Sequence, residues 1–86
     1  MQLVLPSWFK QRQGKAEPAG PDTYRLTAPQ LAESYISIRR GANDLWYGAL
    51  RMTADGPDVA VTEPVCETPD EAWEAAFELH RTHLVV

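Results

Sequence analysis

The sequence predicts an α+β fold in which one long C-terminal helix packs on one face of a three-stranded antiparallel β-meander. Three observations support this: a strong helix start near the C-terminus, alternating apolar and polar residues upstream, and turn residues between the alternating segments. A chain of 86 residues with 44% hydrophobic and 23% charged residues fits one small soluble domain.

The C-terminal segment Glu67–Val86 carries the clearest local signal. Thr68 and Glu71 have the spacing of a capping box, and Pro69 falls at the first helical position, where its missing N–H costs nothing. At about 100° per residue, one helix face collects Trp73, Ala76, Phe77, His80 and Leu84. Charged side chains take the opposite face, so the apolar face must pack against the rest of the domain.

Three strands are expected before this helix, over Ser34–Arg40, Leu45–Thr53 and Val59–Thr62. Turns are expected at Gly41–Asp44 and Ala54–Asp58 because both are rich in turn-forming residues. In the third strand the two valines should face inward, and Gly56 in the second turn is suited to a positive φ.

The region before the first strand leaves two alternatives open. Tyr24–Leu26 fits either a short strand or an extended lead-in. Thr27–Gln30 repeats the capping-box spacing, which allows a short helix over Ala28–Glu33.

Residues 1–22 are expected to form a flexible N-terminal arm and linker, and residues 23–86 a single small α+β domain. Gly14–Asp22 is rich in Gly, Pro and Ala and has no periodicity. The apolar residues of the arm are Leu3, Leu5, Trp8 and Phe9. They either dock on the domain or engage a partner or a second copy, and docking is the favoured interpretation.

Charge and cysteine content limit the classes of function. The net charge of −4 repels phosphate backbones unless basic residues segregate. A single cysteine, Cys66, excludes an intramolecular disulfide and fits a reducing compartment. No apolar run reaches the length of a membrane span, so no membrane association and a cytoplasmic location are expected.

No residue pattern predicts catalysis, a metal or a cofactor. His80 and His83 could approach one metal, but no further ligand lies near them in the sequence, so a core histidine is the preferred interpretation. Cys66 precedes an acidic helix start, which raises the pKa of a thiol. The glutamates of the last helix fit a solvated stripe. We therefore expect no enzyme, no metal site and no cofactor.

The best candidate for binding is the outer face of the sheet. Alternation places Tyr35, Ser37, Arg39, Tyr47 and Arg51 together there if the first two strands pair antiparallel, with Arg40 at the rim. Such a set serves protein interfaces, where Tyr and Arg dominate the binding energy, and also single-stranded nucleic acid. An ordinary exposed face with cross-strand pairs is the plain alternative.

The preferred function is a small non-enzymatic interaction or regulatory module of unknown partner, with homodimerisation as an option. Its tentative binding residues are Tyr35, Arg39, Tyr47, Arg51, Trp8 and Phe9. The alternative is weak binding of single-stranded nucleic acid on the same Tyr/Arg face.

The expected order of elements over Thr27 to Leu84 is similar in topology to double-stranded RNA-binding domains. That family carries lysines at the start of its last helix, where they grip phosphates. Here the corresponding segment reads Thr68-Pro69-Asp70-Glu71-Ala72, which is acidic. The resemblance therefore argues against duplex binding.

Overall fold

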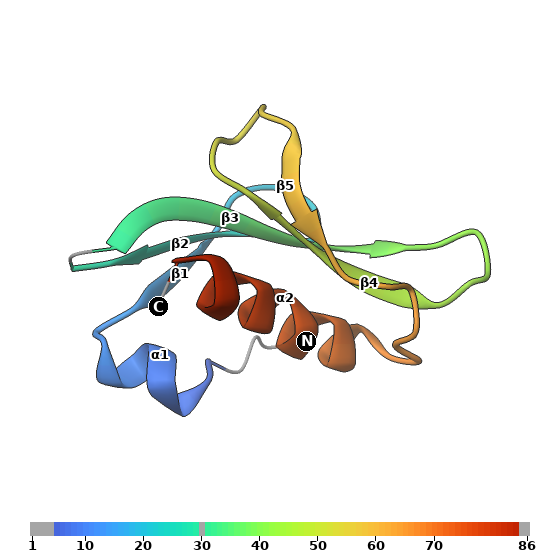
Figure 1. The fold of residues 1–86 in the computed structure, drawn as a ribbon, viewed down its shortest axis with the longest axis horizontal. Coiled ribbons are helices and arrows are strands. Elements are labelled where there is room, and N and C mark those ends of the chain that lie inside the picture. Colours follow the sequence, from blue (N-terminus) through green and yellow to red (C-terminus); the bar gives the residue numbers. More distant parts are fainter. Residues whose placement is uncertain (1–4, 30, 85–86) are drawn as a thin grey trace.

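The computed structural model describes residues 5–29 and 31–84, which form one antiparallel sheet and two helices (Figure 1). The elements are α1 (Ser7–Gln11), β1 (Lys15–Pro18), β2 (Thr23–Ala28), β3 (Leu31–Arg40), β4 (Trp46–Arg51), β5 (Asp58–Val61) and α2 (Pro69–Leu84). The strands follow one another across the sheet in chain order. The α+β class, the antiparallel sheet and the C-terminal helix are thus confirmed. The expected number of three strands is wrong, because the sheet has five.

Helix α2 begins where the capping signal placed it. The backbone N–H of Glu71 donates to Thr68 Oγ1 at 3.2 Å, and the Thr68 hydroxyl donates to Glu71 Oε1 at 3.3 Å. Thr68 thereby satisfies one of the N–H groups that a first helical turn leaves free. The last two residues of the predicted segment, 85–86, lie outside the described residues.

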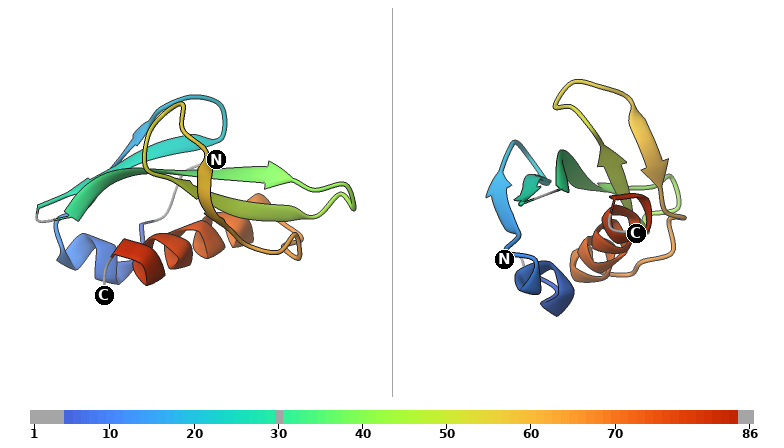
Figure 2. Two further views of the ribbon diagram at one scale, coloured as in Figure 1. Left: turned by 45° about the horizontal axis from the view of Figure 1, so that its top comes forward. Right: turned by 60° about the vertical axis from the view of Figure 1, so that its left-hand side comes forward.

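The apolar face of α2 lies across β3 and β4 (Figure 2). It buries Ala72, Trp73, Ala76, Phe77 and His80. The sheet supplies Leu26, Ile36, Ile38 and Leu50 to the same core. Gly48 permits this close approach, because a Cβ there would lie 2.8 Å from the backbone nitrogen of Ala76. A side chain at this position would push the helix away from the sheet.

Strands β3 and β4 pair antiparallel, as the alternation predicted. Ile36 lies opposite Leu50 on the face toward α2, and Ser37 lies opposite Ala49 on the other face. The turn between these strands forms at the predicted place, with Asp44 in the left-handed region at φ 66°. This register determines which side chains lie together on the face of the sheet turned away from α2.

The N-terminal region contains a short helix held by its own C-terminal turn. The N–H of Gly14 donates to the carbonyl of Phe9 at 2.9 Å, and the N–H of Gln13 donates to that of Lys10 at 2.9 Å. Gln13 has φ 60°, so the turn is a Schellman motif. Gly14 lies against the Phe9 ring so closely that a Cβ would come within 2.5 Å of it. Leu3, which was expected to dock, lies outside the described residues.

Strand β1 lies within the stretch that was expected to be a flexible linker. It pairs antiparallel with β2, with Ala16 opposite Leu26. Its own sequence has no apolar alternation, so its pairing with β2 defines it as a strand.

Tyr24–Leu26 belongs to strand β2, and the short helix that was allowed over Ala28–Glu33 is not present. Ala28 pairs with Leu31 instead, so β2 and β3 form a hairpin there, and Gln30 lies outside the described residues. Pro29 sits in the hairpin turn, where its fixed φ is suitable.

Strand β5 differs from the prediction in orientation. Ala60 lies opposite Leu50 and packs toward the core, while Val59 and Val61 are 52% and 53% exposed. A register irregularity between Leu50 and Arg51 accompanies this change. The expectation that both valines face inward is wrong, because Val61 pairs with Ala49 on the face turned away from α2 and Ala60 takes the core-facing position.

The turn before β5 also differs in detail. Gly56 does not adopt the positive φ that was expected. A Cβ on Gly56 would instead collide with the hydroxyl of Thr53. Glycine fits this position because of the close approach and not because of its φ.

Candidate interaction surfaces

The outer face is the side of the sheet turned away from α2. The register places Tyr35 opposite Arg51 and Arg39 opposite Tyr47, with Ser37 on the same face between Tyr35 and Arg39. All five side chains that alternation predicted to be neighbours therefore share this face. The four larger ones are half-buried, so each keeps part of its surface toward solvent.

The centre of the outer face is a floor of small side chains. Thr23, Ser37 and Ala49 are buried there. The hydroxyls of Thr23 and Ser37 lie 3.1 Å apart in a hydrogen bond, and Nη2 of Arg51 lies 3.5 Å from Ser37 Oγ. The long side chains of Tyr and Arg stand around this floor, so the surface is shallow and its centre is polar.

One arginine of this face is held by a carboxylate across the sheet. Arg39 donates two hydrogen bonds to Asp58, at 2.6 and 2.8 Å. This pairing raises the pKa of Arg39 and lowers the pKa of Asp58 below its ordinary value. The guanidinium of Arg39 is therefore largely neutralised by its own chain.

A second arginine on this face is paired as well. Arg25 lies 3.2 Å from a carboxylate oxygen of Glu17 and 3.4 Å from one of Glu33. Its hydrogen bond with Glu17 is the main cause that raises the pKa of Arg25, ahead of the charges of Glu17 and Glu33. The outer face thus mixes both signs of charge and is not a basic patch.

Arg51 differs from these two. Across residues 5–29 and 31–84, no carboxylate lies within ion-pair distance of it, and its one hydrogen bond joins Nη2 to Ser37 Oγ at 3.5 Å. Its cross-strand neighbours are Tyr35 on β3 and Asp58 on β5, and the carboxylate of Asp58 is paired with Arg39. Tyr47 is on the same strand as Arg51. Among Arg25, Arg39 and Arg51, Arg51 is therefore the arginine without an ion pair, and it has guanidinium donors left for an external acceptor.

Arg40, expected at the rim, is engaged elsewhere. Its guanidinium carbon lies 5.6 Å from the centre of the Trp46 ring, within the range of a cation–π contact. Its Nε donates to the carbonyl of Asp44 at 3.4 Å. Arg40 thus supports the end of the β3–β4 hairpin.

The two aromatic residues of the N-terminal region have different environments. Phe9 is fully buried, with its ring centre 5.5 Å from that of Phe77. Trp8 is half-buried and stacks on the ring of His80 at 5.9 Å. Of this pair, only Trp8 presents surface that a partner could contact.

The histidine and cysteine side chains considered for catalysis or metal binding differ in exposure: His80 and Cys66 are buried, and His83 is exposed. Burial lowers the pKa of His80 to about 4, and His83 is exposed one turn later. Burial, followed by the charges of Glu71 and Glu74, raises the pKa of the Cys66 thiol.

The described part of the chain contains no group of three or more His, Cys, Asp or Glu placed to hold a metal. None of its helices is long and apolar enough to cross a membrane.

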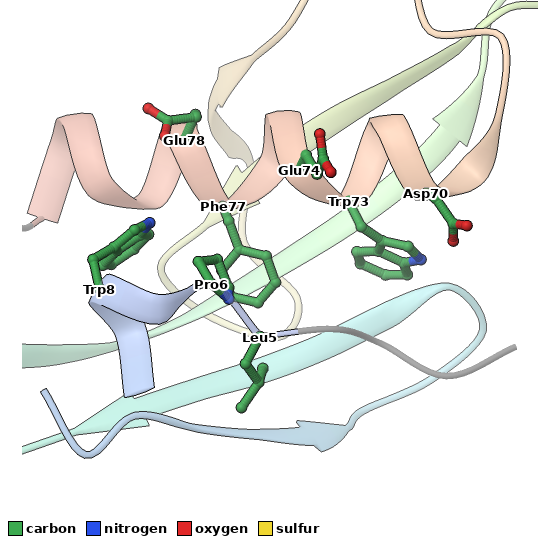
Figure 3. A pocket seen from close by; sticks show the side chains of 8 residues that line it. All are labelled: Leu5, Pro6, Trp8, Asp70, Trp73, Glu74, Phe77 and Glu78. Atoms are coloured by element: carbon green, nitrogen blue, oxygen red, sulfur yellow. The ribbon is translucent and has the colours of Figure 1, made fainter. Parts of the chain in front are cut away.

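A groove between α1 and α2 was not predicted (Figure 3). Its volume is about 540 Å³, and its lining residues are Leu5, Pro6, Trp8, Asp70, Trp73, Glu74, Phe77 and Glu78. The sequence contained one signal for it, the stripe of acidic residues on the last helix. That stripe was interpreted as solvated because the position of α1 beside it was unknown.

Comparisons of the chain with protein-family models, curated proteins and solved structures find no match.

Proposed function

We propose that this protein is a small non-enzymatic interaction or regulatory module that binds a protein partner through its outer face. The observation that carries the proposal is the state of Arg51, which has donors left over beside two half-exposed tyrosines while Arg25 and Arg39 are paired. A fixed guanidinium next to aromatic rings is a common arrangement at the energetic centre of protein interfaces. The partner surface should offer a carboxylate or carbonyl acceptor to Arg51.

The first experiment compares the proteins that co-purify with the intact chain and with two charge-matched variants. Arg51→Glu reverses the charge of the arginine that has no ion pair, and Arg12→Glu makes the same change in charge on an exposed residue after α1. We expect a partner that Arg12→Glu retains and Arg51→Glu loses, and that binds the purified chain directly. A partner set that is the same for both variants would contradict the proposal.

Removing residues 1–22 is not a valid test of this surface. That truncation deletes buried Phe9 and strand β1, so loss of binding would report unfolding. Point changes at exposed positions leave the core intact and are preferred.

Self-association is a second form of this proposal, and strand β5 supports it. β5 is an edge strand with Val59 and Val61 half exposed, whereas the opposite edge strand β1 carries Lys15, Glu17 and Pro18. Charges and proline protect an edge from pairing, and β5 has less of this protection. We expect Val61→Lys to shift sedimentation toward the monomer if two copies pair there. A wild-type chain that stays monomeric at high concentration would refute this form.

Binding of single-stranded nucleic acid ranks lower. Stacking on Tyr35 and Tyr47 would suit bases, but two of the three arginines on this face are paired with carboxylates. Binding of this kind should weaken steeply with salt. Titration with mixed oligonucleotides at two salt concentrations tests it, and salt-insensitive binding or none would exclude it.

The single buried thiol of Cys66 supports a cytoplasmic setting for the module.

A further inference from the structure

We infer that the groove between α1 and α2 binds a basic peptide segment in which lysine or arginine alternates with apolar residues. Both helices lie on the same side of the sheet (Figure 2), so the groove between them is away from the outer face. It is a second surface, and its test is independent of the test of the outer face.

The floor of the groove is apolar, and it is formed by side chains of α2 and of the N-terminal region. Phe77 projects from α2 toward Leu5 and Pro6, Trp73 lies beside it near Asp70, and Trp8 stands at the end formed by α1 (Figure 3). Helix α1 cannot turn freely, because Phe9 is fully buried beneath it. A volume of about 540 Å³ is within the range of pre-formed binding sites.

The charge of the groove selects the kind of partner. Among the described residues, its lining contains the carboxylates of Asp70, Glu74 and Glu78 and no basic side chain. In the described part of the chain, neither Asp70 nor Glu74 has an ion-pair partner, and Glu78 has only the exposed Arg81 at 3.7 Å. An exposed pair of this kind contributes little. Cationic side chains of a partner would meet uncompensated negative charge near the half-buried ring of Trp8, which also attracts cations.

The spacing of the carboxylates indicates the form of the peptide. They recur every four residues along α2, which corresponds to about 6 Å along the helix axis. In an extended peptide, side chains on the same face recur at about 6.6 Å. An extended segment that lies along the groove could therefore place its basic residues next to successive carboxylates and its apolar residues toward the half-buried Leu5, Pro6 and Trp8.

The test is an amide NMR titration of the full chain, with the indole N–H signals of Trp8 and Trp73 as direct reporters. The probe is an acetylated and amidated peptide of sequence KAKLKAK, and the neutral control peptide is SASLSAS. The test variant is Glu74→Gln/Glu78→Gln. The matched control variant, Glu63→Gln/Glu67→Gln, removes the same number of charges at exposed positions outside the groove.

We expect KAKLKAK to shift the groove signals, and the test variant to raise its Kd about fivefold or more while the control variant raises it less than about twofold. Absence of shifts at Trp8 and Trp73 would overturn the inference. Equal weakening by both variants, or equally tight binding of SASLSAS, would also overturn it. Arg51→Glu should leave this binding unchanged, so failure of the groove and failure of the outer face can be told apart.

Discussion

The environment of His80 makes a strong prediction about stability and pH. Its side chain is 1% exposed, stacks on Trp8 and meets the edge of Phe9 with ring centres 5.6 Å apart. Within the described residues, its Nδ1 has no hydrogen-bond partner. A charged imidazolium here would lose its hydration without compensation, which is why burial lowers the pKa of His80 from 6.5 to about 4.

The direction of the pH effect on stability follows from whether the folded or the unfolded chain binds the proton on His80. Between pH 6.5 and about 4, the unfolded chain holds a proton on His80 that the folded chain does not, so stability falls as the pH falls through this window. The full loss is about 3 kcal/mol, of which about 2 kcal/mol occurs between pH 7 and pH 5. Asp58 affects the unfolding free energy in a lower pH range. Its pKa is lowered from 3.8, so its contribution is present above that pH and is lost only below it.

The assay is urea denaturation followed by circular dichroism at pH 7, 6 and 5. The wild type should lose about 2 kcal/mol of unfolding free energy over this range. His80→Leu, which removes the titrating group, should lose much less. His83→Gln, on the exposed last turn, should behave like the wild type. A wild-type unfolding free energy that is constant between pH 7 and pH 5 would refute the reasoning, as would His80→Leu with an unchanged pH dependence.

Three further predictions concern the packing of the two helices, each checked by urea denaturation at pH 7. Gly48→Ala should destabilise by about 1 to 3 kcal/mol, because the new Cβ meets the backbone of Ala76; an unchanged midpoint would show that α2 can move aside freely. Thr68→Ala should cost about 1 kcal/mol by removing the cap of α2, whereas Thr68→Ser should retain most of the stability; equal losses would argue against the cap. Phe9→Ala should cost about 3 to 5 kcal/mol, because Phe9 is fully buried; a loss below about 1 kcal/mol would mean that α1 is not part of the core.

The parts of the fold that the sequence predicted are those set by local signals. The start of α2 needs only Thr68, Pro69 and Glu71, and the alternation in β3 and β4 needs only their own residues. The outer-face neighbours followed from that alternation, since antiparallel pairing fixes which side chains share a face.

The missed elements depend on contacts between distant segments. Strand β1 contains a proline and no alternation, and it exists through its pairing with β2. Helix α1 has five residues and no side-chain cap, so it depends on buried Phe9 and the turn at Gly14. The ion pairs of Arg25 and Arg39 could not be predicted, because they require the positions of β1 and β5.

The most direct test of the proposed function is photo-cross-linking in cells that produce the protein. Benzoylphenylalanine replaces Tyr47 on the outer face or, as a control, Ala42 in the exposed turn after β3. We predict a cross-linked protein at position 47 that is absent at position 42 and disappears when Arg51→Glu is added. The absence of an adduct at position 47, or the same adduct at both positions, would contradict the proposal that the outer face binds a protein partner.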